Sequence, residues 1–195
     1  MLGIVLCGGQ SLRMGADKGL LIHDQKPWAR LAQEKLVLLG IPVKCVINVT
    51  QLPRYTPHFQ QEELILDQEA LEVKGPLLGT LSAHIANPES DLFVLACDLV
   101  SMQAKLMDTV LKTYRCNEGV FEAYIFVNEA QQEPLCGIYT AAGLKKINAM
   151  RHANGLARHS MKYVLSQLKV CEIPVEAKDV HCFRNFNSPG ELDAV

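Results

Sequence analysis

Short, almost continuous apolar runs alternate with longer amphipathic segments along this chain, and this alternation restricts its fold more than any other feature. Three of the runs are residues 3–7 (GIVLC), 43–49 (VKCVINV) and 92–97 (LFVLAC). Such runs are typical of strands that are buried on both faces, as in parallel sheets with helices on both sides. With right-handed crossovers, the pattern predicts an α/β fold: a three-layer, doubly wound, mostly parallel sheet.

Further segments extend this alternation towards the C-terminus. Helices are expected at residues 27–39, 75–86, 103–114, 141–150 and 155–168, and strands at 63–66, 120–127, 133–140 and 170–175. The strand at 133–140 could run antiparallel, and residues 183–192 are expected to form a short strand and a helical turn. Because no repeat, low-complexity tract or linker interrupts the chain, we expect one domain spanning residues 1–195.

The charge balance and the cysteines narrow the class of protein. A formal net charge of −2 argues against a broad nucleic-acid or anionic-membrane surface, and no apolar run approaches the roughly 18 residues needed to span a bilayer. The N-terminus lacks a secretory pattern. The seven cysteines include no C-x-x-C pair, and the histidines have no metal-ligand spacing. We therefore expect a cytoplasmic protein that binds neither zinc, nucleic acid nor a membrane.

A glycine-rich segment follows the first expected strand. Residues 6–19 read LCGGQSLRMGADKG and place Arg13 and Lys18 among four glycines. The spacing matches neither the dinucleotide-binding fingerprint nor the Walker A loop, and plain turn chemistry is an equal alternative. However, backbone N–H groups at Gly8 and Gly9 together with two cations suit a triphosphate. The segment is therefore a candidate phosphate-binding loop, in which Asp17 either faces solvent or holds the shape of the loop.

Polar side chains also lie at the ends of the next three expected strands: Asn48 near the end of the second, Asp67 after the third and Asp98 after the fourth. The carboxyl ends of parallel strands share one edge of the sheet, where ligands bind in this architecture. Asp98 suits Mg²⁺, which takes one or two carboxylates with phosphate oxygens. We favour that role over a helix cap, for which Ser101 is available. Asp67 could equally form a turn or a cap, and Asn48 could simply end its strand.

The loop resembles the signature L-A-G-G-x-S-x-R-M-G-x-D-K-x-L-L of the molybdenum cofactor guanylyltransferases, which are Rossmann-like nucleotidyltransferases. Further similar motifs occur in the family's order, so the resemblance covers nearly the whole chain. They are GPLLG (75–79), LACD (95–98), EPLCGIY (133–139) and FRNFNSPGEL (183–192).

This resemblance implies transfer of GMP from GTP to the terminal phosphate of molybdenum-bearing molybdopterin, with release of pyrophosphate and with Mg²⁺ as cofactor. It also implies hand-over from a molybdenum-inserting protein and to molybdoenzyme chaperones. Asn48 and Asp67 would lie on the nucleoside side, Arg13 would neutralise phosphate charge, and Asp98 would bind the metal. The expected sites are, for nucleotide, Leu6, Cys7, Gly8, Gly9, Lys18, Asn48, Asp67 and Asp98; for catalysis, Arg13, Lys18 and Asp98; and for the acceptor, Asn185 and Asn187.

The sequence departs from the family pattern at three places. Leu99 and Val100 stand where the family has x-Pro after the aspartate, Cys7 replaces an alanine, and Phe186 separates the two asparagines. A cytidylyltransferase of the same superfamily is the nearest alternative, although such enzymes often carry an alanine where Gly8 stands. A non-catalytic nucleotide-binding relative is the other alternative, but it would be expected to lose Arg13, Lys18 or Asp98.

Overall fold

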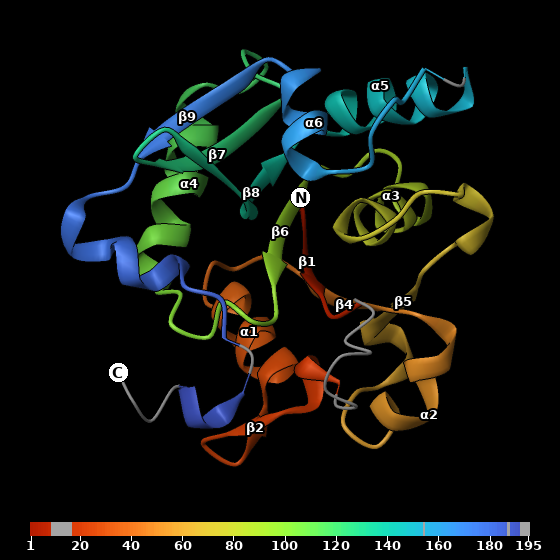
Figure 1. The fold of residues 1–195 in the computed structure, drawn as a ribbon, viewed down its shortest axis with the longest axis vertical. Coiled ribbons are helices and arrows are strands. Elements are labelled where there is room, and N and C mark those ends of the chain that lie inside the picture. Colours follow the sequence, from red (N-terminus) through yellow and green to blue (C-terminus); the bar gives the residue numbers. More distant parts are fainter. Residues whose placement is uncertain (9–16, 154, 187, 192–195) are drawn as a thin grey trace.

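A seven-stranded sheet forms the centre of the molecule, with strand order β5-β4-β1-β6-β8-β7-β9 (Figure 1). The computed structural model describes residues 1–8, 17–153, 155–186 and 188–191. The sheet strands are β1 (Leu2–Leu6), β4 (Val43–Ile47), β5 (Leu64–Leu66), β6 (Leu92–Ala96), β7 (Ala123–Asn128), β8 (Gln131–Tyr139) and β9 (Val170–Pro174). A separate two-stranded hairpin pairs β2 (Ile22–His23) with β3 (Lys26–Pro27).

Most neighbouring strands run parallel, as the apolar runs predict. β1 pairs in parallel with β4 and with β6, β4 with β5, and β7 with β9. The exception is β8, which is antiparallel to both β6 and β7, so the antiparallel option for residues 133–140 is the one realised. The register between β7 and β8 shifts between Ile125 and Phe126.

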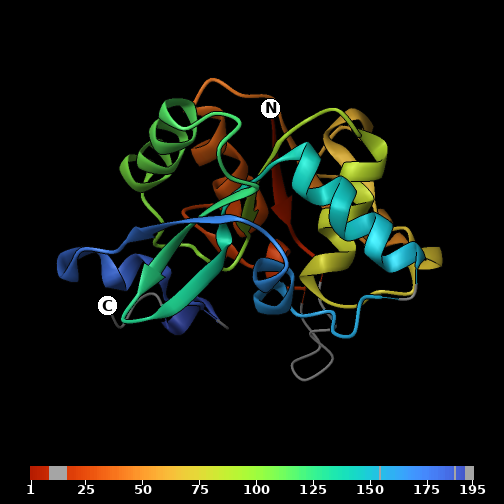
Figure 2. The same ribbon diagram turned by 90° about the horizontal axis from the view of Figure 1, so that it is seen from above.

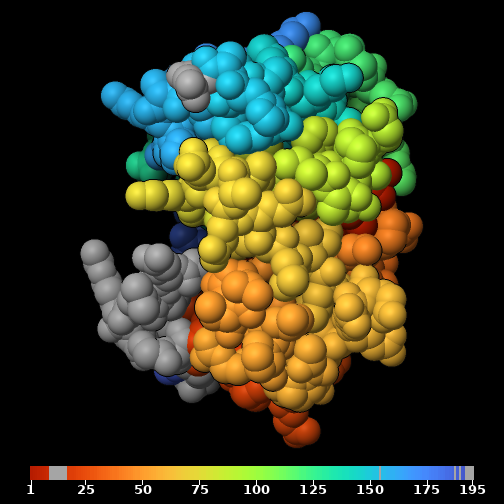
Figure 3. Space-filling view, turned by 90° about the vertical axis from the view of Figure 1, so that its right-hand side faces the viewer, coloured from red at the N-terminus to blue at the C-terminus, as the bar shows by residue number. Residues whose placement is uncertain are grey.

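Helices cover both faces of the sheet, which gives the three predicted layers (Figure 2). The helices are α1 (Trp28–Val37), α2 (Leu52–Tyr55), α3 (Pro76–Ala86), α4 (Ala104–Cys116), α5 (Ala141–His152) and α6 (Met161–Ser166). The apolar sides of α1 and α4 pack into one core, and those of α3, α5 and α6 pack into a second core on the opposite face. In Figure 3, α3 with the segments around it and α5 and α6 above hide most of the sheet.

Local sequence signals explain where the main helices begin and end. Pro27 precedes α1 with a φ of −58°, close to the value that its ring imposes, and Gly40 follows the helix at a φ of +73°. Gly75 enters α3 at a φ of +66°, a conformation that favours glycine, and Pro76 takes the first helical position. The Thr140 hydroxyl accepts the Gly143 N–H and so caps α5.

Two expected elements near the C-terminus are wrong. The helix expected at 155–168 is only α6, because the Ser160 hydroxyl accepts the Tyr163 N–H and starts the helix at Met161. No strand forms at 183–186. Phe183 is the last residue of a 3₁₀ segment, η5 (Ala177–Phe183). The Phe186 N–H donates to the carbonyl of Asp98 instead of to a sheet partner. The other helices and strands agree with expectation to within a few residues.

Short 3₁₀ turns supply several of the loops that carry polar groups. They are η1 (Lys18–Leu20), η2 (Val49–Gln51), η3 (Gln61–Glu63), η4 (Glu69–Leu71) and η6 (Pro189–Glu191), besides η5. Among the described residues, the helices are all too short or too polar to cross a membrane.

Candidate active site

Four parallel strands end at one edge of the sheet and place the predicted polar residues there. In sheet order, β5 is followed by Asp67, β4 by Asn48, β1 by Cys7 and Gly8, and β6 by Cys97 and Asp98. The pairing continues past the strands, since Cys7 N–H donates to Val46 O at 3.0 Å and Cys97 N–H to Leu6 O at 3.2 Å. The predicted site residues that follow the strands are therefore brought together by strand pairing.

Lys18 and Asp98 form an ion pair across this edge. Lys18 Nζ lies 3.1 Å from Asp98 Oδ2, and the two side chains are 27% and 19% exposed. Lys18 lies near the end of the glycine-rich segment and opens η1, whereas Asp98 follows β6. The pair therefore sets a cation and a carboxylate side by side at a partly open place, as binding of a phosphate together with a metal ion requires.

Asp17 is the buried anchor of the loop. Its side chain is only 3% exposed, and it accepts hydrogen bonds from Gly19 N at 3.1 Å, Gln51 Nε2 at 2.7 Å and Tyr55 Oη at 3.0 Å. Gln51 Nε2 also donates to Cys7 O at 3.1 Å. Of the two options for Asp17, solvent exposure is therefore wrong: the carboxylate fixes the backbone from which Lys18 projects.

Gly19 permits the close approach of Tyr55. A Cβ at position 19 would lie 2.1 Å from Tyr55 Oη and 3.3 Å from Cys7 Cβ. Tyr55 is fully buried, and burial raises the pKa of its hydroxyl, with the thiol of Cys7 and the carboxylate of Asp17 adding to the shift. The tyrosine therefore stays a neutral hydrogen-bond donor to Asp17 at all physiological pH values.

Asp67 lies between two glycines. A Cβ at Gly8 would be 3.0 Å from Asp67 Oδ2, and one at Gly79 would be 3.4 Å from Asp67 Oδ1 and 2.9 Å from Leu6 Cδ2. Within the described residues Asp67 Oδ1 is buried and accepts no hydrogen bond. Burial, with a smaller contribution from Glu69, raises the pKa of Asp67 to about 6. A buried acceptor without a donor is a natural contact for the N–H groups of a ligand.

Asn48 caps the turn after β4. Its Oδ1 accepts from Gln51 N at 3.0 Å and from Thr50 Oγ1 at 2.6 Å, while Gln51 Oε1 accepts from Asn48 N at 2.9 Å. This reciprocal capping box starts η2 and holds Gln51 in place for its contacts with Asp17 and Cys7. Asn48 therefore has a structural task at the site edge, and a contact with nucleotide remains a prediction.

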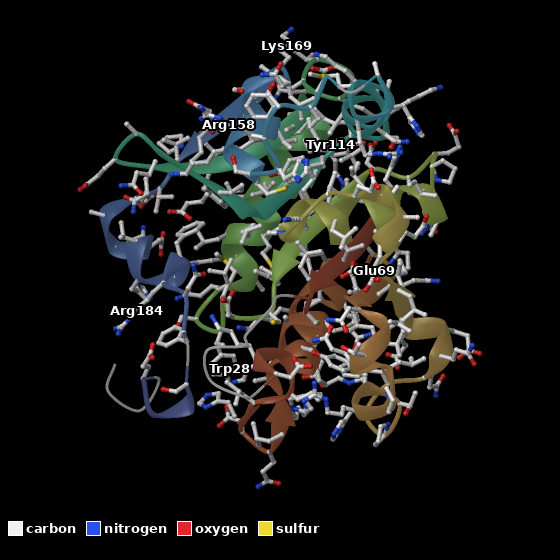
Figure 4. All side chains as sticks on the ribbon, turned by 45° about the vertical axis from the view of Figure 1, so that its right-hand side comes forward. Trp28, Glu69, Tyr114, Arg158, Lys169 and Arg184 are labelled. Carbon is white, nitrogen blue, oxygen red and sulfur yellow. The ribbon has the colours of Figure 1, made fainter. Side chains whose placement is uncertain are left out.

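Asp98 does not cap the helix that follows it. That helix, α4, begins at Ala104 with Gln103 as its N-cap and without a side-chain capping bond, so Ser101 is not its cap either. The carbonyl of Asp98 accepts the Phe186 N–H at 3.1 Å. This bond brings the exposed Asn185 to the same loop, and Figure 4 shows its neighbour Arg184 on the C-terminal segment at the edge of the molecule.

The sulfur of Cys7 belongs to the core and not to the site. Cys7, Cys45 and Cys97 pack in the core cluster on the α1 and α4 side, and burial raises the pKa of the Cys7 thiol well above its usual value, as do its neighbours Cys45 and Cys97. Cys7 therefore offers backbone groups and no thiolate. Leu6 is also buried, with its side chain in the opposite core.

Three predicted site residues, Gly9, Arg13 and Asn187, lie outside the described residues. In the described part, no group of three or more histidine, cysteine or acidic side chains is arranged to hold a metal ion. A single partly open carboxylate, Asp98, instead fits Mg²⁺ that is shared with phosphate oxygens and water. Gln51 and Tyr55 were not among the predicted site residues, because no motif marks a residue that reaches the site only through folding.

The sheet order and this polar edge define an α/β protein with the nucleotidyltransferase fold. The model of the MobA-like NTP transferase domain matches residues 3–169, and this chain belongs to that family. The family resemblance drawn from the motifs is thereby confirmed.

Relatives of known name cover nearly the whole chain. A probable molybdenum cofactor guanylyltransferase of Flavobacterium johnsoniae is 26% identical over 97% of this chain and 93% of its own length. A molybdenum cofactor guanylyltransferase of Campylobacter jejuni is 27% identical over 94% of this chain and 89% of its own. The solved structure of molybdopterin-guanine dinucleotide biosynthesis protein A from Archaeoglobus fulgidus matches with a TM-score of 0.77 and 20% identity, over 100% of this chain and 96% of that one. This last likeness shows the fold.

Proposed function

We propose that this protein transfers GMP from GTP to the terminal phosphate of a molybdopterin-type acceptor that carries molybdenum, with release of pyrophosphate. The names of the full-length relatives support the reaction. The observation in this chain that carries it is the Lys18–Asp98 pair, 3.1 Å apart beside the glycine-rich segment. Together with the family, this pair supports a site for a nucleoside triphosphate and a metal ion.

In the proposed reaction, an oxygen of the acceptor phosphate attacks the α-phosphorus of GTP in line. The new bond is from that oxygen to the α-phosphorus, and the bond from the α-phosphorus to the bridging oxygen breaks, so pyrophosphate leaves with the electron pair. Lys18 neutralises phosphate charge, as does Arg13, and Asp98 would hold Mg²⁺, which supplies further charge neutralisation when bound. Asn185 and Asn187 are assigned to the acceptor side.

Asp67 supports the choice of guanine. Guanine presents two adjacent N–H donors on its pairing edge, which suit the two oxygens of a carboxylate. Asp67 offers one oxygen facing Gly8 and a second that is buried without a donor among the described residues. Leu6, Cys7, Gly8 and Gly9 would line the same pocket through their backbone, with Asn48 at its rim. Binding of guanine would compensate for the cost of burying this carboxylate.

The proposed setting is the cytoplasm, with acceptor received from a molybdenum-inserting protein and product passed to molybdoenzyme chaperones. All seven cysteines are free thiols, as expected in a reducing compartment.

Calorimetric titration with GTP, CTP, ATP and UTP, each with and without Mg²⁺, tests the proposal. We expect GTP to bind best, and K18A to weaken Mg·GTP binding by about tenfold or more, since a charge-assisted contact with phosphate is worth roughly 1.5–3 kcal/mol. K26A is the matched control, because Lys26 pairs with Glu34 on α1. Preference for CTP would assign a cytidylyltransferase, and binding of none would contradict the proposal. Transfer of radiolabel from α-³²P-GTP to acceptor, and its loss in D98N, then tests the chemistry.

A further inference from the structure

The loop after β6, residues 97–103, carries Asp98 and is held by its own backbone and by buried side chains. Leu99 N–H donates to Ala96 O at 3.3 Å, and Met102 N–H donates to Leu99 O at 3.0 Å. Leu99 and Met102 are 4% and 2% exposed. These contacts fix the middle of the loop against the core and leave the carbonyl groups of Asp98 and Val100 for other partners.

Those two carbonyl groups are held by separate parts of the chain. The carbonyl of Asp98 accepts the Phe186 N–H at 3.1 Å, from the C-terminal segment. The carbonyl of Val100 accepts a hydrogen bond from the ammonium group of Lys35, which belongs to α1. In Figure 1 the loop lies beside α1 and the descending C-terminal segment, in agreement with these two hydrogen bonds. The backbone that carries the Asp98 carboxylate is therefore held from both sides.

Lys35 is unusual for a lysine near the end of a surface helix. Such side chains ordinarily extend into water. Lys35 instead turns inward and is half-buried beside Cys182 of η5, and burial lowers the pKa of its ammonium group. Desolvating a charge is costly unless a strong hydrogen bond compensates for it. The charged donor is therefore directed at one particular carbonyl oxygen, two residues after Asp98.

We propose that Lys35 is a positioning residue for Asp98, holding the loop at Val100 so that the carboxylate stays where it can bind the metal ion. This role rests on the proposed function only in that Asp98 binds Mg²⁺; Lys35 itself contacts neither substrate nor metal. A shift of about 1 Å in a group that positions substrate or metal can cost on the order of a hundredfold in rate. The loss of the hydrogen bond by which Lys35 holds the loop should therefore have a measurable effect on activity.

The test compares K35M, K35R and the control K26M with wild type in two assays. The first is amide hydrogen exchange at Leu99 and Met102, which needs no ligand. The second is the Mg²⁺ concentration that gives half-maximal turnover of GTP. For K35M we expect both exchange rates and the Mg²⁺ requirement to rise about tenfold, with kcat at saturating Mg²⁺ within about twofold of wild type. In K35R the exchange rates and the Mg²⁺ requirement should return most of the way to the wild-type values. K26M should change neither quantity.

Unchanged loop exchange in K35M, or equal changes in K26M, would overturn the inference. So would faster exchange throughout α1 and the sheet, because that is the mark of a general loss of stability. If wild type neither binds nor turns over Mg·GTP, the proposed function fails, and the exchange assay alone then decides whether Lys35 holds the loop. Should K35M not fold, K35Q, a shorter neutral donor, is judged by the same exchange criterion.

Discussion

Gly19 and Tyr55 show how one hydrogen atom in place of a side chain shapes this site. The tyrosine hydroxyl occupies the space that a Cβ at position 19 would take, and from there it donates to Asp17 at 3.0 Å. The glycine is thus required by a contact with a residue 36 positions further along the chain. Its backbone φ gives no reason for it, so the requirement comes from tertiary packing.

The two positions should therefore be coupled in stability. We expect G19A alone to reduce the free energy of unfolding by about 2–3 kcal/mol through overpacking, and Y55F alone by about 1 kcal/mol through the lost hydrogen bond. In the G19A/Y55F double variant the clashing oxygen is gone. The stability lost by the double variant should therefore be at least 1 kcal/mol smaller than the sum of the losses of the two single variants. Urea unfolding of the four proteins measures this; simple additivity would show that the contact does not decide the cost.

Asp67 should give ligand-free stability a measurable pH dependence. With its pKa raised to about 6 by burial, the folded protein holds a proton that the unfolded chain releases near pH 4. Stability should therefore fall as the pH rises from about 4 to 6. We expect D67N and wild type to have the same free energy of unfolding near pH 4, and D67N to be more stable by about 2 kcal/mol at pH 7. Urea unfolding at both pH values measures this difference. If the stability difference between D67N and wild type stayed constant across this range, the pKa of Asp67 would not be raised in the folded protein.

At the scale of elements, α1 is tied to the turn before β5 by Arg30. Its Nη1 lies 2.8 Å from Glu63 Oε1 and its Nη2 lies 3.3 Å from Oε2, while Gln33 Nε2 donates to the same carboxylate at 2.8 Å. The guanidinium also lies 4.2 Å from the centre of the Phe59 ring. These contacts, led by the Arg30 hydrogen bond, lower the pKa of Glu63 to about 2.

This network should stabilise the protein at neutral pH and lose its effect in acid. The lowered pKa of Glu63 means that its contribution is complete above about pH 4.5 and disappears as the pH falls towards 2. We expect E63Q to cost about 1 kcal/mol at pH 7, because the pair is near the surface, and almost nothing near pH 2. Urea unfolding at several pH values checks this, with E34Q, on the exposed side of α1, as a control. An E63Q cost that persisted at pH 2 would refute the electrostatic explanation.

At the scale of the whole molecule, the site is assembled from four strand ends, so its ligand should stabilise the entire fold. A ligand that binds only the folded state at one hundred times its Kd adds about 2.7 kcal/mol, which for a chain of this size corresponds to a rise in Tm of roughly 5–10 °C. For the wild-type protein we expect this rise in Tm with Mg·GTP and a smaller rise with GTP in the absence of Mg²⁺. For the K18A variant we expect little rise with Mg·GTP. Calorimetric scanning measures it, and an equal rise with Mg·CTP would speak against guanine selectivity.

Much of the fold follows directly from the sequence. Apolar runs and helical periods predict the seven sheet strands and most helices. Strands buried on both faces and amphipathic helices each require a recognisable pattern of apolar residues in the local sequence. The late start of the helix expected at 155–168 is set by the capping Ser160, a local signal that the apolar periodicity does not contain. The path of residues 183–186 depends on a hydrogen bond from Phe186 to the loop after β6, and a single hydrogen bond between distant segments leaves no local pattern.

The sequence by itself determined the α/β architecture, the family, and the residues that follow the strands at the polar edge, among them Lys18, Asp67 and Asp98. The common direction of the predicted strands suffices for this, since every parallel strand delivers its next residue to the same edge. Only the tertiary structure decided that Lys18 pairs with Asp98, that Asp17 is buried under Tyr55 and that Lys35 reaches the loop of Asp98. Each of these contacts joins groups far apart in sequence, and packing, not local propensity, sets the distances between them.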